Sequence, residues 1–209
     1  MAGNCHQTRR EAAIIARTPT SRQTLLFSAT YPDGIQHISG RVQREPVTIR
    51  VSSAADKPDI EQVFIEVDPA MRSEVLYQVI AHYRPESCLV FCNTKQQCAQ
   101  LATALQARDL HVRSLHGDLE QSERDQVLAR FAGKSLSILI ATDVAARGLD
   151  VKALDAVINF ELSPDPEVHI HRIGRTARAG ASGIAVSLFT SSEQRRVQAI
   201  EDYQGSSAT

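Results

Sequence analysis

Three arginines, Arg172, Arg175 and Arg178, stand three residues apart in the segment HRIGRTARAG. On a helix, this spacing places successive guanidiniums on neighbouring turns of one face, where their like charges repel. A bound anion would offset the repulsion, and guanidiniums bind phosphate in a fork and stabilise the charge that develops in phosphoryl transfer. The small residues Gly174 and Ala177 between them allow close backbone packing. We therefore predict a phosphate site here, in preference to a solvated basic face.

The residues before the arginines predict the helix that carries them. Ser163 or Asp165 can cap its amino end, and Pro166 fits its first turn. His169 and His171 lie two residues apart, which points them to different faces of a helix and makes them poor joint metal ligands. We expect no metal site in this chain.

Strand-like and helical patterns alternate from residue 60 onward. Apolar runs of strand length cover residues 60–67, 87–93, 111–116, 136–143, 154–162 and 183–190. Strands that are apolar throughout, with helices between them, are typical of a mostly parallel sheet that helices cover on both faces. We expect one α/β domain over residues 60–203, followed by a tail at 204–209.

The first fifty residues do not fit that unit. TLLFSAT (24–30) resembles a buried strand, and DGIQHISGRVQ (33–43) resembles a helix. One strand and one helix cannot bury a core, so we interpret residues 1–50 as the remnant of a preceding domain. The polar, proline-containing stretch at 51–59 reads as a linker.

Three of the strand-to-helix turns carry short polar residues. Parallel strands end at one edge of a sheet, where ligands gather, so these turns would line one rim. Each would open a helix, whose free N–H groups and positive dipole end suit phosphate. The turns contribute Asn93 and Thr94, then Gly117, and then Thr142 and Asp143, with Arg124 one turn into the second helix.

The second turn has a specific capping prediction. Asp118 is a good N-cap, and Gln121 follows three residues later as its capping-box partner. Any one of the three turns alone is better explained as a simple helix cap. Together they favour a ligand with repeated phosphates, namely a single strand of nucleic acid.

The composition is that of an ordinary soluble globular protein, with 209 residues, 43% of them hydrophobic and 22% charged. A net charge of −1 gives no basic field, so nucleic-acid binding would depend on local arginine placement. No apolar run approaches the length of about 20 residues that spans a bilayer, and the first ten residues lack the apolar core of a secretory signal. We expect a cytoplasmic protein that does not contact a membrane.

Two site-like patterns are interpreted as structural. The four cysteines form no CxxC pair, which favours buried free thiols over a metal site. The run Gly133-Lys134-Ser135 resembles the end of a phosphate loop, but Leu128 stands where the loop requires its first glycine. Gly133 is better explained as a helix C-cap.

Together these stretches resemble the DEAD-box ATP-dependent RNA helicase family. The similarity extends over residues 20–190 and is closest to the bacterial DbpA type, which acts in ribosome assembly. It rests on the order and spacing of FSAT (27–30), VFCNT (90–94), QSER (121–124), ATDVAARGLD (141–150) and HRIGRTAR (171–178). It implies that residues 60–203 are the carboxyl-terminal RecA-like domain of a helicase and residues 1–50 a remnant of the first RecA-like domain.

The resemblance also implies roles for individual residues. Arg175 and Arg178 would be arginine fingers at the γ-phosphate of ATP, and His171 would couple the nucleotide site to the first domain. Gly148 and Asp150 would bind ATP, the latter at the ribose. Ser28 and Thr30 would link hydrolysis to strand separation. The RNA backbone would contact the rim residues Asn93, Thr94, Gly117, Arg124, Thr142 and Asp143.

The sequence departs from the family in one major respect. It has no phosphate loop, no Asp-Glu-Ala-Asp motif and no Gln-containing adenine-recognition element. The resemblance implies that a first domain supplies these parts and holds most of the Mg²⁺. Because phosphoryl transfer needs the metal, the phosphate cradle and the arginines together, we expect the chain alone to be inactive.

Two other functions are compatible with part of the pattern. A stand-alone RNA-binding or regulatory module would need the rim but not FSAT, which belongs to the other domain. An unrelated α/β enzyme would need a nucleophile or base on the rim, where His116 is the candidate, although in LHGD it fits better as a residue that orients the turn. The partners expected from the helicase reading are RNA, among which ribosomal RNA is a candidate, and the first helicase domain.

Overall fold

The computed structural model describes residues 14–27, 33–49, 60–147, 154–176 and 183–205. Contacts divide the chain into two compact units, Met1–Ser52 and Ser53–Thr209, which are considered separately. Several predictions fall outside the described residues. They concern the linker at 51–59 and the site residues Ser28, Thr30, Gly148, Asp150 and Arg178.

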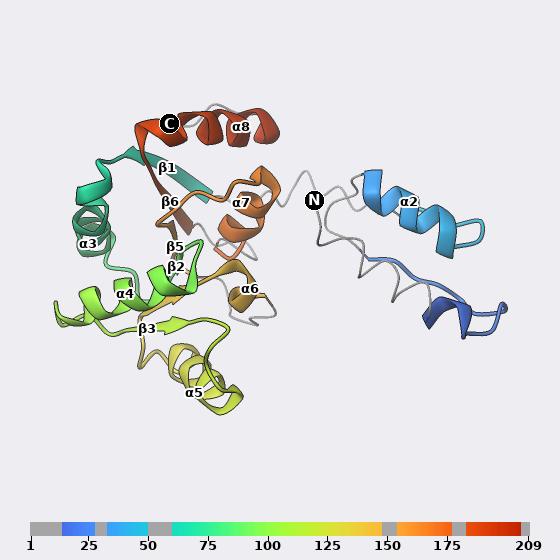
Figure 1. Cartoon of the computed structure of the whole chain (residues 1–209), viewed down its shortest axis with the longest axis horizontal. Helices are drawn as coiled ribbons and strands as arrows, with labels where there is room; N and C mark the ends of the chain where they lie inside the picture. Colours follow the sequence, from blue (N-terminus) through green and yellow to red (C-terminus); the bar gives the residue numbers. More distant parts are fainter. Residues whose placement is uncertain (1–13, 28–32, 50–59, 148–153, 177–182, 206–209) are drawn as a thin grey trace. The chain divides into compact units, whose positions relative to one another are not determined.

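The second unit is built on a six-stranded sheet (Figure 1). Its spatial order is β1-β6-β5-β2-β4-β3, and each neighbouring pair is parallel. All six predicted strands are confirmed. They are β1 (Ile60–Glu66), β2 (Cys88–Phe91), β3 (Val112–Leu115), β4 (Ile138–Ala141), β5 (Ala156–Asn159) and β6 (Gly183–Phe189).

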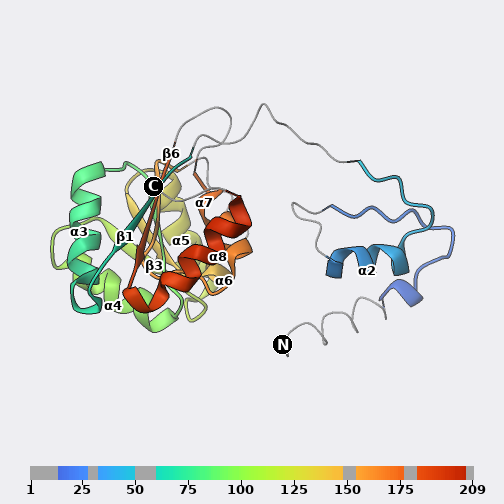
Figure 2. The same cartoon turned by 90° about the horizontal axis from the view of Figure 1, so that it is seen from above.

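Helices cover both faces of this sheet (Figures 1 and 2). Alternate residues of one strand serve the two faces, as the period of two requires. In β2, Val90 packs in a core with α3 (Arg72–Tyr83) and α4 (Lys95–Gln106), whereas Leu89 and Phe91 pack in a second core with α5 (Gln121–Ala132) and α6 (Asp143–Ala146). The elements are η1 (Pro69–Met71), α3 (Arg72–Tyr83), α4 (Lys95–Gln106), α5 (Gln121–Ala132), α6 (Asp143–Ala146), α7 (Pro166–Ile173), η2 (Ser191–Glu193) and α8 (Gln194–Gln204).

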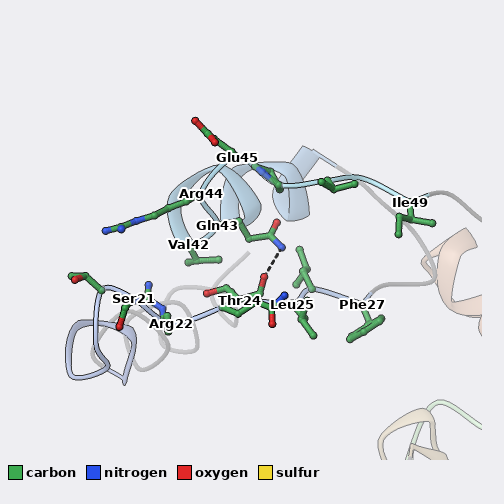
Figure 3. Close-up of a pocket in the computed structure, with 15 residues that line it drawn as sticks. Ser21, Arg22, Thr24, Leu25, Phe27, Val42, Gln43, Arg44, Glu45 and Ile49 are labelled. Carbon is green, nitrogen blue, oxygen red and sulfur yellow. Dashed lines mark hydrogen bonds between the residues drawn. The ribbon is translucent and has the colours of Figure 1, made fainter.

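In the first unit, the predicted helix forms as α2 (Asp33–Val42), but the predicted buried strand does not. The described part of that strand, residues 24–27, pairs with no other described strand, and Leu25 and Phe27 are 67% and 89% exposed. A strand is stabilised by neighbours that accept its backbone hydrogen bonds. Within the described residues, the Thr24 carbonyl accepts only a side-chain bond, from Gln43 Nε2 at 3.2 Å (Figure 3).

A groove of about 610 Å³ opens beside this segment. Leu25 and Phe27 line it together with Val47 and Ile49, which are 87% and 81% exposed (Figure 3). Exposed apolar side chains at every second position are typical of a strand that has lost one of its covering layers. Among the described helices, none is long and apolar enough to cross a bilayer.

Candidate functional site

The three polar turns follow β2, β3 and β4, which are neighbours in the parallel sheet. Thr94 is the N-cap of α4, and its Oγ1 accepts from the Gln97 N–H at 3.2 Å. Thr142 is the N-cap of α6, with its Oγ1 3.4 Å from the Ala145 nitrogen. Both predicted helix starts are confirmed, and the topology places them at one edge of the sheet.

The second turn differs from its prediction. Helix α5 begins two residues later than expected, with Glu120 as N-cap, and the Glu120 N–H donates to the Glu123 carboxylate at 3.1 Å. A separate turn comes first, because the Leu119 N–H bonds to the His116 carbonyl and Leu119 packs against the core. Asp118 is therefore free to pair with Lys95 at 2.8 Å, and the Lys95 ammonium lowers the pKa of its carboxyl.

Two further rim residues were expected to contact RNA. Arg124 is half-buried, and its Nη2 donates to the Ala145 carbonyl at 2.8 Å, which ties α5 to α6. Gly117 has open space within 4 Å of the position that a Cβ would occupy. Nothing inside the described chain therefore requires a glycine at this position, and the space is open to an external ligand.

Thr94→Ala is expected to lower the free energy of unfolding by about 1 kcal/mol, because the Gln97 N–H loses its capping acceptor. Thr94→Ser keeps the oxygen and should remain close to wild type. Urea unfolding followed by far-UV circular dichroism measures both variants. Equal losses for alanine and serine would show that the methyl group, rather than the cap, stabilises this turn.

The arginine helix corrects the prediction of a shared anion face. Arg172 does not project with Arg175 but is 1% exposed, with its guanidinium inside the domain. Its counter-anion is Asp143, which accepts from Nε at 2.7 Å and from Nη2 at 2.8 Å. The repulsion expected from the three-residue spacing is thus partly relieved by a carboxylate of the same domain.

The other Arg172 hydrogen bonds reach two more strand ends. Nη2 donates to Asn93 Oδ1 at 3.0 Å, and Nη1 donates to Asn159 Oδ1 at 3.2 Å and to the Glu161 carbonyl at 2.8 Å. The guanidinium carbon lies 5.0 Å from the centre of the Phe91 ring, within cation–π range. The Arg172 guanidinium therefore connects α7 to residues that end or directly follow β2, β4 and β5.

Two of the Arg172 partners were not predicted from the sequence, namely Asn159 at the end of β5 and the Glu161 carbonyl just after it. Asn159 is fully buried and also donates from Nδ2 to Ser187 Oγ at 3.0 Å. A signal for it was present, because Asn159 is an amide in the middle of the apolar run LDAVINFEL and a buried amide needs partners. The Glu161 carbonyl carries no such signal, since every residue has one.

Arg175 and His171 remain accessible, as a ligand-binding role requires. They line a small cavity of about 100 Å³ between α6 and α7, together with Arg147 and the buried Arg172–Asp143 pair. Within the described part of the chain, the side chains of Arg147 and Arg175 make no hydrogen bond or ion pair. The cavity thus presents two uncompensated guanidiniums, and its size suits a single phosphate-sized anion.

Two patterns are interpreted as structural from the sequence, namely the run Gly133-Lys134-Ser135 and the cysteines. Gly133 is the C-cap of α5, and Lys134 pairs with Glu86 at 2.7 Å beyond the amino end of β4. Cys88, Cys92 and Cys98 are buried free thiols, as predicted, whereas the fourth cysteine, Cys5, lies outside the described residues. Burial raises the pKa of Cys88 to about 12.

His169 is buried in α7 at 1% exposure, whereas His171 is exposed, so the two rings do point to different sides. Neither nitrogen of His169 has a hydrogen-bond partner, and its ring stacks on Phe64 with centroids 5.8 Å apart. Burial, with a smaller contribution from the Arg172 charge, lowers its pKa from 6.5 to about 4. The folded domain therefore holds this imidazole neutral.

Acidification should destabilise the domain through His169. Its folded pKa lies below its unfolded value, so the stability is complete above pH 6.5 and is lost as the pH falls toward 4. At pH 5 the loss is about 2 kcal/mol relative to pH 7. Urea unfolding at both pH values should show a smaller loss in His169→Phe than in the wild type. The exposed His171→Gln serves as the control, and an unchanged pH dependence in His169→Phe would contradict the assignment.

The fold and the rim define this unit as a RecA-like α/β domain of the helicase type. The model of the family described as "Helicase conserved C-terminal domain" matches residues 71–180. The chain belongs to this family and carries the carboxyl-terminal domain of a DEAD-box RNA helicase.

Curated relatives support the finer resemblance. The chain is 53% identical over 189 residues to the ATP-dependent RNA helicase DbpA of Escherichia coli. It is 42% identical over 190 residues to the DEAD-box ATP-dependent RNA helicase CshA of Geobacillus kaustophilus. Each match covers 90% of this chain and 41% of the relative, so the chain spans less than half the length of either protein.

Solved structures share the fold. Saccharomyces cerevisiae Dbp5 bound to RNA and ADP BeF3 superposes with a TM-score of 0.86 at 28% identity, covering 100% of this chain and 56% of that chain. A DEAD box protein from the hyperthermophile Methanococcus jannaschii gives a TM-score of 0.69 at 36% identity, covering 96% and 54%.

Proposed function

We propose that this chain is the carboxyl-terminal half of an ATP-dependent RNA helicase, which binds the RNA backbone and supplies arginine fingers to a cleft shared with a first domain. RNA lies along the rim formed by the ends of β2, β3 and β4. The observation that carries the proposal is the alignment of three turns on adjacent parallel strands, two of them with threonine N-caps.

Phosphates fit this rim for physical reasons. α4 and α5 each have 12 residues and direct their amino ends to the rim, where unpaired N–H groups carry partial positive charge. Gly117 leaves space between them, and Arg124 adds a full charge nearby. Such contacts read the backbone and not the bases, so the RNA target, including ribosomal RNA, is proposed from the resemblance to DbpA alone.

The nucleotide binds on the side of α6 that faces α7, away from the RNA rim. Arg175 and Arg178 reach the γ-phosphate of ATP, Gly148 and Asp150 bind the nucleotide, and His171 faces the first domain. The first domain supplies the phosphate loop and the Mg²⁺ ligands, so the chain alone does not hydrolyse ATP.

Ser28 and Thr30 in the first unit connect hydrolysis to strand separation. The setting proposed for this reaction is the cytoplasm.

RNA binding by the chain tests the rim. Anisotropy of a labelled oligouridylate should show binding whose logarithm falls with log salt at a slope of about −2, as expected for roughly three neutralised phosphates on a single strand. Arg124→Gln should weaken binding and make the slope less steep by about 0.7.

Lys134→Gln is the matched control, because it removes the same charge at the opposite edge of the sheet, beyond the amino end of β4. It should leave the affinity unchanged. Equal effects of the two substitutions would indicate binding to overall charge and would overturn the rim. Tight RNA binding without any hydrolysis in the presence of a first domain would favour a stand-alone RNA-binding module instead.

A further inference from the structure

Every hydrogen of the Arg172 guanidinium has an acceptor. A guanidinium has five N–H donors in one plane, and five hydrogen bonds of 2.7 to 3.2 Å leave it. At 1% exposure, and with every N–H used inside the domain, this group has no donor left for a bound ligand. Arg172 therefore acts on the site through its protein partners and not by touching RNA or nucleotide.

Two of those partners stand beside the rim caps. Asn93 directly precedes the α4 cap Thr94, and Asp143 directly follows the α6 cap Thr142. The polar atoms of the Asn93 side chain are used inside the domain, since Oδ1 accepts from Arg172 and Nδ2 donates to the Leu162 carbonyl at 3.1 Å. Both Asp143 oxygens accept from Arg172.

The Arg172 backbone is also bonded to Arg175, the candidate arginine finger. Arg175 follows α7 in a turn, and its N–H donates to the Arg172 carbonyl at 3.1 Å. Its own carbonyl accepts from the Leu154 N–H at 3.1 Å. A rotation of α7 about Arg172 therefore moves the backbone from which the Arg175 guanidinium projects.

We propose that Arg172 is a positioning residue that couples the RNA rim to the arginine finger. Phosphates that bind along the rim shift Asn93 and Asp143, and the planar guanidinium transmits this shift to α7 and so to Arg175. Asn93 and Asp143 then serve RNA binding by positioning the caps. The inference rests on the proposed function, because it requires RNA at the rim.

The substitution Arg172→Lys separates the geometry of the guanidinium from its charge. Arg172→Lys keeps the positive charge near Asp143 but has three donors and no plane, so it cannot bridge all four partners. We expect RNA affinity to fall about 10-fold while the domain stays folded. Arg108→Lys, just after α4, is the matched control, since Arg108 bonds to Glu74 of α3 at 2.6 Å and has no partner in the Arg172 network, and it should bind RNA like the wild type.

The decisive readout is the Arg175 side chain. The Nε–Hε signal of Arg175 in a ¹H–¹⁵N NMR spectrum, assigned with Arg175→Lys, should shift when oligouridylate binds the wild type and should not shift in Arg172→Lys at saturating RNA. Unchanged affinity together with a retained shift in Arg172→Lys would overturn the coupling.

The single variant Asn93→Ser covers the case in which Arg172→Lys unfolds at the assay temperature, and a double-mutant cycle of the two substitutions separates positioning from contact. Asn93→Ser removes one of the five Arg172 bonds. If Asn93 acts through Arg172, Asn93→Ser alone weakens the RNA-induced Arg175 shift, and the affinity loss of the double variant stays well below the product of the single losses. Independent losses and a full shift in Asn93→Ser would overturn the inference. RNA binding with a static Arg175 signal in the wild type overturns the coupling alone, whereas no RNA binding overturns the proposed function and the coupling with it.

Discussion

Arg175→Ala is expected to lower RNA-stimulated ATP hydrolysis by about 1,000-fold or more in a mixture of this chain and a separately produced first helicase domain. The loss follows from charge. In the transition state, negative charge spreads over the equatorial oxygens of the transferred phosphoryl group, and an arginine finger is worth on the order of 10³–10⁵ in rate. Arg175 suits this role because no described side chain compensates its guanidinium.

The experiment follows phosphate release with RNA, ATP and Mg²⁺ present. Arg196→Ala is the control, since it removes an arginine whose partners lie on η2 and after β5. Activity should appear only in the mixture and survive in the control. Hydrolysis by this chain alone at a rate typical of a helicase would contradict the need for a second domain, and full activity of Arg175→Ala would remove it from the site.

Arg172→Ala should lower the free energy of unfolding by about 3–5 kcal/mol, the range for breaking a buried ion pair at one partner. Alanine leaves the fully buried Asn159 oxygen, the Glu161 carbonyl and Asn93 Oδ1 without their donor and opens a cavity over Phe91. Asp143 contributes less to the loss, because its side chain is 31% exposed and can be hydrated.

Chemical unfolding of Arg172→Ala and Arg196→Ala measures this contribution directly. Arg196 is 43% exposed in its pair with Glu193, so its removal should cost about 0.5 kcal/mol or less. Similar losses for the two variants would mean that the five hydrogen bonds of Arg172 add little beyond hydration.

The strands and helix starts could be predicted because their causes are local. An apolar run such as 136–143 needs no partner to be recognised, and Thr94 caps α4 through an N–H three residues away. The α5 start was placed two residues early because Asp118 and Gln121 form a valid capping pattern. The packing of Leu119 against the core, which depends on residues distant in sequence, sets a separate turn before α5 and leaves Asp118 outside the helix start.

The burial of Arg172 lay beyond a local pattern. A spacing of three predicts which residues share a helix face, but it does not say where that face is covered. The partners that make Arg172 internal are 79, 29 and 13 positions away, at Asn93, Asp143 and Asn159. The strand prediction at residues 24–27 was wrong for the converse reason. A strand pattern is local, but strand pairing depends on neighbours elsewhere in the chain.

The strand order has a consequence for how this domain is made. Among the described strands, β1 pairs only with β6, and the paired residues Ile60 and Gly183 lie about 120 positions apart. At a synthesis rate of about 5–20 residues per second, β1 leaves the ribosome about 6–24 seconds before its partner exists. During that interval β1, which contains Val63 and Ile65, has no strand to pair with. The sheet is therefore completed only after almost all of the domain has been translated, and β1 is the described strand that stays unpaired longest.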